Sequence, residues 1–503
     1  MIFLRMLLSL LLPAISGVLL TFLLLPGGDR VRPSMLLFRF FTGIGFGLGI
    51  ASCLQFLCLL AGTPRAVIAL DLAVCLALGF TVWFHGRQAA GDEPALVGKD
   101  HQPRSGAWFD RLLSPLFGLG LVAWLVSFAV ATLREPQGRW DAWLIWNMHA
   151  RFLYRGGEAW RDAFASGLDW SHWDYPLLLP LSILRGWIYA GQEELRMPAV
   201  IALVFTFLTL GLLVSALCVF RHRTQGLLAG LLLLGTPFFI AMGAAQFADV
   251  PLAFFILATV TILTWQQRSV RPGALALAGL AAGLAAWTKN EGLLFILVVA
   301  GSFTLIMAYR EGLRPALRGA AAFLAGLLPV LLIILCFKLN LAPANDILAG
   351  LDPVALGDKL LDGSRYIRIL QSFFITGLSF TQGIFDVRQG MALNLGAVNV
   401  LLPLVYLLLA GISDNWRARE GSLLCLTILA LTLAGYFVVY LLTPLDLEYH
   451  LLTSLNRLFI QLWPAFLLAV FLVAGNDEAE TGRDDGSSPV GKSSGKGRTG
   501  RAK

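Results

Sequence analysis

Residues 197–220 read MPAVIALVFTFLTLGLLVSALCVF and contain no charged side chain. A helix of roughly 20 apolar residues crosses the hydrocarbon core of a bilayer, so this stretch predicts a membrane span. Comparable stretches lie at 6–25, 36–62, 65–84, 112–133, 226–245, 247–265, 272–288, 292–309, 316–338, 393–411, 421–443 and 456–474. The first is too long for the apolar part of a signal peptide and is expected to remain as an anchor. The sequence therefore predicts an all-α polytopic membrane protein with a bundle of about 13 transmembrane helices.

The composition excludes a soluble globule. Hydrophobic residues make up 57% of the 503 residues and charged residues 14%, against roughly 25% charged in an ordinary soluble domain. The six cysteines all lie in apolar stretches, which argues against disulfide frameworks and paired-cysteine metal sites. The net charge of +7 comes from cations in short loops between apolar runs. That pattern indicates membrane orientation and excludes nucleic acid as a partner.

The loop charges predict the orientation. Alternate short loops carry fifteen Lys and Arg residues, whereas the opposite short loops contain only Arg65 and Lys289 before the last span. Positive loops face the cytoplasm, so we expect a multi-pass protein of the plasma (inner) membrane with its N-terminus outside. Apolar segments 177–190 and 366–380 are too short to span and predict interfacial helices in the outer loops.

The predicted organisation has six parts. These are N-terminal transmembrane helices (1–133), a first large outer loop (134–196), central transmembrane helices (197–338), a second large outer loop (339–392), C-terminal transmembrane helices (393–475) and a disordered cytoplasmic tail (476–503). The tail is rich in Gly, Ser and charge, a composition that cannot bury a core.

Polar side chains gather at the outer ends of the predicted spans. They lie in the clusters Trp140–Trp143, His172–Pro176, Gln246–Asp249, Thr288–Gly292 and Glu448–His450, with Arg457 nearby. Polar groups at membrane depth are costly and usually mark a function. Any chemistry is therefore expected at the outer membrane–water boundary.

Each cluster also has a purely structural interpretation. Asp141 starts a predicted helix at 140–154 and has no partner one turn on, so it either complements the helix N-terminus or points into a cavity. Asp174 and Asp249 are helix-cap candidates. Lys289 and Glu291 can neutralise each other, although a lysine on the outer side runs against the charge asymmetry and favours a phosphate partner. His149 and Arg151 are expected on a solvated face.

Carboxylates, a few cations and aromatic side chains at one interface suit transfer of a group from a lipid-linked phosphate. A carboxylate would accept the proton of the acceptor hydroxyl as general base. The leaving phosphate needs positive charge rather than a proton, and Lys289 or arginines would supply it.

The same motifs resemble the GT-C class of polytopic glycosyltransferases, in particular bacterial members that use polyprenyl-phosphate sugars and are related to protein O-mannosyltransferases and the lipid A aminoarabinose transferase. The resemblance rests on Asp141 followed by Gly156, on Asp174-Tyr175-Pro176-Leu177-Leu178, on Asp249 before an apolar helix, and on Thr288-Lys289-Asn290-Glu291-Gly292. These motifs occur in the order and on the face that the class shows. Three additional helices precede the first motif here, where the simplest members have one.

The resemblance implies roles for individual residues. Asp141 would be the catalytic base, Asp174 and Asp249 would orient acceptor or sugar, and Lys289 would bind the donor phosphate. Arg457 is a looser match to a late phosphate contact and ranks above His450, while His172, Tyr175 and Glu291 complete the predicted substrate-binding set. The expected partners are a polyprenyl-phosphate-linked sugar donor, a lipid, glycan or protein acceptor, and membrane lipid. Ala142 stands where many relatives have a second acid, so a divalent metal is not favoured and no cofactor is assigned.

Two other functions remain open from the residues alone. A transporter or flippase of a lipid-linked or anionic substrate would place polar groups in mid-helix and break its helices at related positions. An envelope-polymer ligase or polymerase would rely on arginines of a large outer loop, for which Arg365, Arg368 and Arg388 are candidates.

Overall fold

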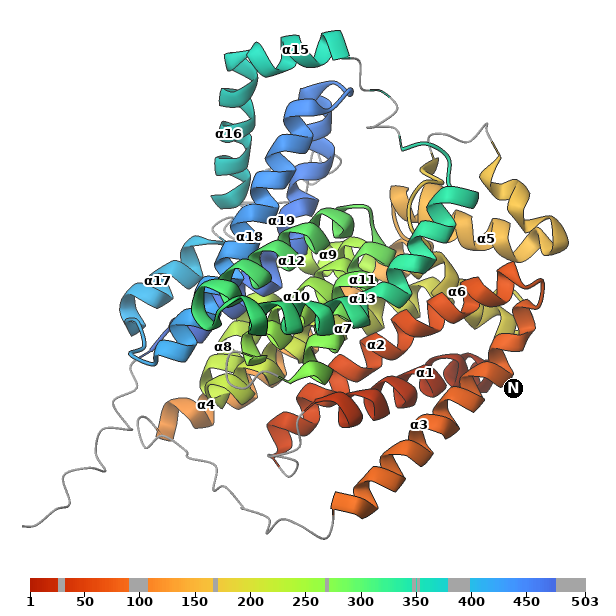
Figure 1. The fold of residues 1–503 in the computed structure, drawn as a ribbon, viewed down its shortest axis with the longest axis horizontal. Helices are drawn as coiled ribbons and strands as arrows, with labels where there is room; N and C mark the ends of the chain where they lie inside the picture. Colours follow the sequence, from red (N-terminus) through yellow and green to blue (C-terminus); the bar gives the residue numbers. More distant parts are fainter. Residues whose placement is uncertain are drawn as a thin grey trace, which may run out of the picture.

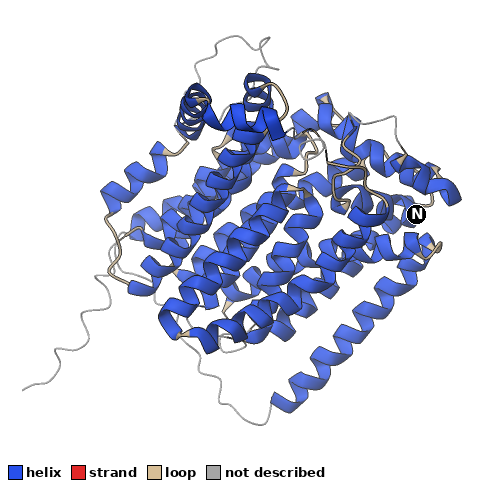
Figure 2. Ribbon diagram, turned by 45° about the horizontal axis from the view of Figure 1, so that its top comes forward, coloured by secondary structure: helices blue, strands red, loops and turns tan. Residues whose placement is uncertain are grey.

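The computed structural model describes residues 1–25, 32–89, 107–165, 171–266, 271–345, 350, 353–378 and 399–475. These residues form helices joined by short connections, and the described part contains no strand beyond an isolated bridge between Ile412 and Ala474 (Figure 2). The predicted all-α architecture is confirmed for them. The predicted disordered tail, 476–503, and Arg388 lie outside the described residues.

Nine helices of the described chain are long and apolar enough to cross a membrane. They are α1 (Ile2–Leu24), α2 (Pro33–Leu60), α3 (Val67–Ala89), α4 (Ala107–Arg134), α7 (Met197–Phe220), α12 (Glu291–Glu311), α13 (Leu313–Asn340), α18 (Trp416–Leu442) and α19 (Leu447–Val473) (Figure 1). This helix content is that of a multi-pass membrane protein, as the composition predicted.

The remaining predicted spans are shorter or broken. The predicted span 226–245 is divided into α8 (Arg223–Leu234) and α9 (Pro237–Ala244), which are bent by 67°. Pro237 cannot donate a backbone hydrogen bond and keeps Thr236 extended, which ends α8. α10 (Asp249–Gln266) and α11 (Pro272–Thr288) lie where predicted but have only 18 and 17 residues. α17 (Leu401–Ala410) is the described part of the predicted span 393–411, so the count of thirteen spans stays a prediction.

The core of the bundle is built around α10 and α11. Both are buried along almost their whole length, and α11 packs closely against α13. A Cβ at Gly279 would lie 1.9 Å from the Phe323 carbonyl oxygen, and one at Gly326 would lie 1.8 Å from that of Ala276. Small residues at these crossings let the two backbones approach, which is how helices associate without a hydrophobic driving force in lipid. α3 and α4 lie at the periphery and are mostly exposed (Figure 1).

Short helices cap one end of the bundle. η2 (Ala142–Trp146) is π-helical and leads into α5 (Asn147–Arg155), η3 (Gly157–Phe164) and α6 (Leu178–Ala190). α6 is the helix predicted at 177–190, but it is almost completely buried against α1, α2 and α5. α15 (Pro353–Leu361) is followed by α16 (Gly363–Leu378), which covers most of the predicted segment 366–380 and packs on α18 and α19 (Figure 1).

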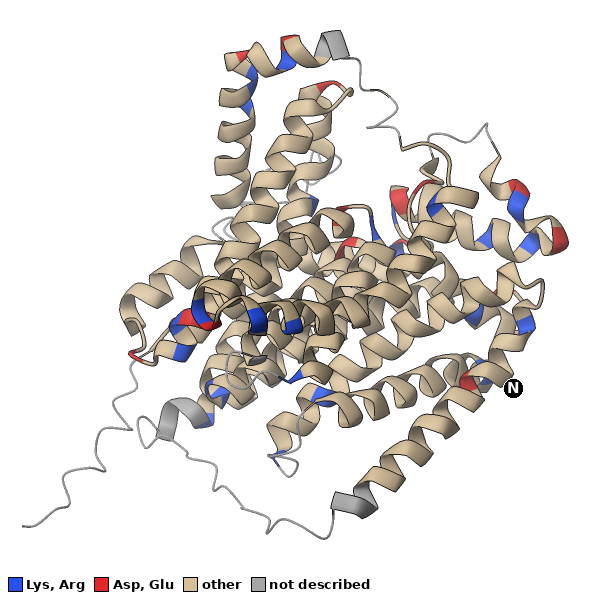
Figure 3. Cartoon of the chain, in the orientation of Figure 1, with Lys and Arg blue, Asp and Glu red and all other residues tan. Residues whose placement is uncertain are grey.

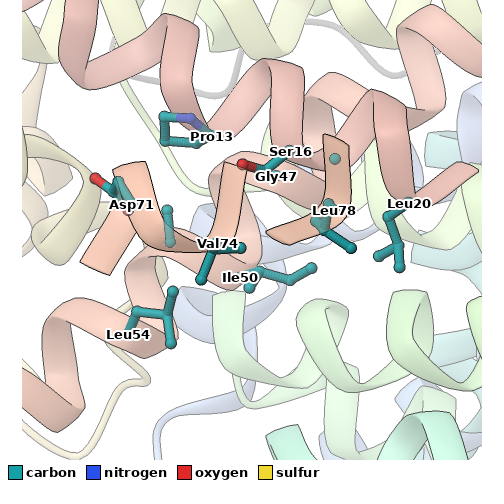
Figure 4. Close-up of a pocket in the computed structure, with 11 residues that line it drawn as sticks. Pro13, Ser16, Leu20, Gly47, Ile50, Leu54, Asp71, Val74 and Leu78 are labelled. Carbon is teal, nitrogen blue, oxygen red and sulfur yellow. The ribbon is translucent and has the colours of Figure 1, made fainter. Parts of the chain in front are cut away.

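A buried ion pair connects α6 to α3, and its arginine also contacts α1 and α2. Arg185 of α6 contacts Asp71 of α3 with Nη2–Oδ2 2.7 Å and Nη1–Oδ1 3.3 Å, and the Tyr189 hydroxyl donates to Asp71 at 2.5 Å. Arg185 also donates to the carbonyls of Ser9 and Ala51. Asp71 also lines a cavity of about 30 Å³ between α1, α2 and α3, whose other lining residues are mostly apolar (Figure 4). That volume suits one or two water molecules, so we interpret it as a gap in packing.

The charged residues separate toward the two ends of the bundle (Figure 3). The end that carries Asp141, Asp249 and Lys289, called the site end below, holds both acids and cations. At the opposite end, Arg221 directly follows α7, Arg271 directly precedes α11, and Arg310 and Arg314 lie at the junction of α12 and α13. This distribution agrees with the predicted loop charges.

Candidate active site

Asp249 is the centre of a polar network at the site end. It is the first residue of α10 and is fully buried. Its Oδ1 accepts from Lys289 Nζ at 3.1 Å and Gln461 Nε2 at 2.6 Å, and its Oδ2 accepts from Arg457 Nε at 3.0 Å and Nη2 at 2.8 Å. A buried carboxylate is tolerated only when its charge and lone pairs are compensated, and four donors achieve that here.

Asp141 joins the network through the same arginine. Its Oδ2 lies 2.7 Å from Arg457 Nη1, while the Arg457 guanidinium packs over the Phe247 ring at 4.9 Å. The sequence left open whether Asp141 points into a cavity or complements a helix end. In the structure its partner is a residue more than 300 positions away, and not one on its own helix.

The residues on both sides of Asp141 are fixed to the turn between α9 and α10. Asn147 Nδ2 donates to Gln246 Oε1 at 2.9 Å, and the Arg139 amide donates to the Ala245 carbonyl at 3.2 Å. Gly138 has φ +73°, and a Cβ there would lie 2.5 Å from the Ala245 oxygen, so only glycine fits. This docking places Asp141 beside Asp249.

Lys289 lies between α11 and α12 and is buried between two carboxylates. Its Nζ is 3.1 Å from Asp249 and 2.7 Å from Glu291. Burial alone would lower the pKa of Lys289, but the Asp249 and Glu291 charges outweigh it and raise that pKa above its ordinary value. The predicted Lys289–Glu291 neutralisation is therefore present, and Asp249 adds a second partner.

Asp174 belongs to a neighbouring polar cluster. Its Oδ2 accepts from Asn290 at 2.8 Å and from Asn345 at 2.7 Å. Lys338 Nζ donates to the Asp174 carbonyl and, at 2.9 Å, to Asn290 Oδ1, and it lies 3.8 Å from the Asp174 carboxylate. Asn290 is flanked in sequence by Lys289 and Glu291, so the two clusters are adjacent. In the structure Asp174 crosslinks loops rather than capping α6.

Aromatic side chains line the same region. The Tyr175 ring stacks on Trp146 and on His172, with centroid distances of 5.7 and 5.0 Å. Burial raises the pKa of Tyr175 well above its ordinary value, and the nearby Glu291 and Asp174 charges raise it further. Tyr175 is therefore a neutral hydroxyl at any physiological pH. His172 reaches its stacking position with φ 51°, an uncommon backbone conformation outside glycine.

Two other predicted positions differ from expectation. His149, expected on a solvated face, is fully buried, stacks on Trp173 at 3.7 Å and lies 2.9 Å from the Ser171 carbonyl through Nε2. Burial lowers its pKa to about 3. His450 bonds to Thr443 Oγ1 through Nδ1 at 3.0 Å.

Sequence reasoning missed Lys338, Gln461 and Asn345. Gln461 and Lys338 are single polar residues inside or at the end of apolar runs, where no local motif marks them. Lys338 nevertheless ends a predicted span on the outer side. The charge asymmetry that drew attention to Lys289 would also have identified Lys338. Among the described residues, no three His, Cys, Asp or Glu side chains are grouped to hold a metal ion.

The structure thus brings Asp141, Asp249, Lys289, Glu291 and Arg457 into one network, with Asp174, Tyr175 and His172 alongside. Comparisons with protein-family models, with curated proteins and with solved structures found no match to this chain.

Proposed function

We propose that the protein is an inverting GT-C type glycosyltransferase. It would move a sugar from a polyprenyl-phosphate donor to a lipid, glycan or protein acceptor at the outer face of the plasma membrane. The observation that carries the proposal is one arginine of α19, Arg457, held between two carboxylates, Asp141 and Asp249. This arrangement puts an accessible base beside a cation that binds phosphate, which is what in-line displacement from a lipid phosphate requires.

In the proposed reaction, an Asp141 oxygen accepts the proton of the acceptor hydroxyl. The acceptor oxygen attacks the anomeric carbon from the side opposite the phosphate, and the bond from that carbon to the phosphate oxygen breaks. The electron pair leaves with the phosphate, whose charge Arg457 stabilises. Asp249 holds Arg457 in place, and Lys289 neutralises Asp249 from its other side.

The positions of the charged residues support an enzyme over a transporter. Asp249 and Glu291 are the first residues of α10 and α12, and Lys289 directly follows α11. A transporter site would lie near the middle of the bilayer between broken helices. The ligase alternative has less support, because Arg365 donates to the carbonyls of Leu441 and Tyr440, and Arg368 pairs with Glu448.

The direct test replaces Asp141 with asparagine in the purified protein, supplied with polyprenyl-phosphate sugars and a pool of envelope acceptors. Loss of a general base lowers a rate by about 10²- to 10⁴-fold, and we expect a loss in this range for Asp141→Asn. Asp162→Asn, which removes an exposed acid from the same outer segment, serves as the matched control and should keep full turnover. Turnover of Asp141→Asn at the unmodified rate would refute Asp141 as the base.

A further inference from the structure

The guanidinium of Arg457 divides its donors unequally between two acids. Nε and Nη2 both contact Asp249, whereas Nη1 contacts Asp141. Asp249 has two further donors, Lys289 and Gln461. Asp141 forms one ion pair in the described structure. The Asp249 side of Arg457 is therefore fixed, and the Asp141 side depends on a single contact.

Exposure follows the same division. The side chains of Asp141 and Arg457 are 17% and 18% exposed, whereas that of Asp249 is fully buried. Asp249 holds the Nε and Nη2 edge of the guanidinium, so a phosphate that binds at Nη1 meets the Asp141 carboxylate there. Two anions at one nitrogen repel each other, so a phosphate and the Asp141 carboxylate would compete for this part of Arg457.

The charges of the network favour replacement of Asp141 by a phosphate over binding of a phosphate beside Asp141. Asp141, Asp249 and Glu291 carry three negative charges against two positive charges on Lys289 and Arg457. A lipid-linked phosphate placed beside them would add a further negative charge in a poorly hydrated site, which is costly without compensation. Departure of Asp141 from Arg457 removes the like charge and frees a guanidinium edge that suits phosphate oxygens.

We propose that Arg457 is an exchange site, where the phosphate of the polyprenyl-linked ligand displaces Asp141 from Nη1. This inference rests on the proposed function and adds the order of its steps, in which the donor binds before the base is released. Without the donor, Asp141 Oδ2 is directed at Arg457 and not at an acceptor hydroxyl. With the donor bound, that oxygen is released beside the sugar, so the base becomes available only when there is something to transfer.

The experiment measures binding rather than transfer. The full chain is placed in phosphatidylcholine nanodiscs and titrated with a polyprenyl phosphate that carries no sugar, and separately with the corresponding polyprenol. Because competition lowers apparent affinity by the fraction of protein in the competent state, we expect Asp141→Asn to bind the phosphate about five- to tenfold tighter than the unmodified protein. Polyprenol affinity should stay unchanged, and Arg457→Gln should lose the preference for the phosphate over the alcohol.

Asp162→Asn is the charge-matched control, because it removes one negative charge from an exposed position of the same loop and lies outside the predicted substrate-binding set. Its phosphate affinity should change less than twofold. Asp141→Ala provides a second variant with the same expected gain should the asparagine variant fold poorly.

Unchanged or weaker phosphate binding in the Asp141 variants would overturn the exchange. An equal gain in Asp162→Asn would also overturn it, since general electrostatics would then explain the result. These outcomes are separate from the transferase test. A protein that transfers sugar but shows no gain in Asp141→Asn keeps its function and loses the exchange, whereas a gain without any transfer keeps the exchange and refutes the transferase.

Discussion

Two ion-pair clusters in this protein use the same residue types for different purposes. The Asp71–Arg185–Tyr189 cluster has one acid and one base, both 3% exposed, with the remaining donors directed to backbone carbonyls. The cluster around Arg457 has three acids, Asp141, Asp249 and Glu291, against two cations, Lys289 and Arg457, and is partly exposed. A balanced and enclosed pair fixes helices, whereas an unbalanced and accessible one leaves a group that a ligand can displace.

The largest expected effect is on the enclosed pair. Arg185→Met leaves the Asp71 charge buried without a cation, and breaking a buried pair in this way costs about 3–5 kcal/mol of unfolding free energy. The double variant Asp71→Leu/Arg185→Met removes both charges and should recover most of that loss. Denaturation in detergent micelles measures both. A single variant as stable as the unmodified protein would show that Asp71 is hydrated, and the contrast between the two clusters would fail.

A smaller and pH-dependent effect is expected beside the accessible cluster. The folded-state pKa of His149, about 3, lies below its ordinary value of 6.5. The unfolded chain therefore takes up a proton as the pH falls below about 6.5 while the folded chain does not, so acid favours unfolding. The loss is about 1.4 kcal/mol per pH unit, or roughly 2 kcal/mol at pH 5. The thermal midpoint at pH 7.5, 6 and 5 measures this loss.

His149→Phe keeps an aromatic ring against Trp173 and should remove that part of the pH dependence. Asp71→Leu/Arg185→Met, which alters only the enclosed cluster, should retain it. The assignment would be wrong if the His149 variant lost stability in acid as steeply as the unmodified protein.

The smallest expected effect tests whether Tyr189 matters to the enclosed pair. Tyr189→Phe removes the hydroxyl that donates to Asp71 but leaves both contacts with Arg185. A single hydrogen bond is worth about 1 kcal/mol net, so we expect a loss of that size in the same denaturation assay. A loss close to that of Arg185→Met would mean that the hydroxyl, and not the arginine, holds Asp71.

The sequence predicted the helices better than it predicted their contacts. Apolar runs located α7, α10 and α11 to within a few residues, because lipid forces backbone hydrogen bonds to be made within each helix. It also placed Asp141, Asp249, Lys289 and Arg457 at one end of the bundle, since alternating spans return to the same face. Their functional roles stay predictions.

Pairing across the fold could not be predicted. The partners Asp71 and Arg185 lie 114 positions apart, and each appears locally as one charge in an apolar run. Intramembrane charge alone marks both as unusual, but it does not indicate which residue each contacts. The buried position of α6 was missed for a similar reason. An apolar segment of 13 residues has the same composition whether it lies at the membrane interface or is buried among other helices.

The unequal helix lengths set how deep the accessible cluster lies. α10 and α11 have 18 and 17 residues, whereas α19 has 27. Arg457 lies ten residues after the start of α19 at Leu447, which at 1.5 Å per residue places it roughly 15 Å below that tip. Asp249 therefore stands back from the ends of its longer neighbours. A molecule that binds Arg457 must therefore extend past the tip of α19 rather than rest on it.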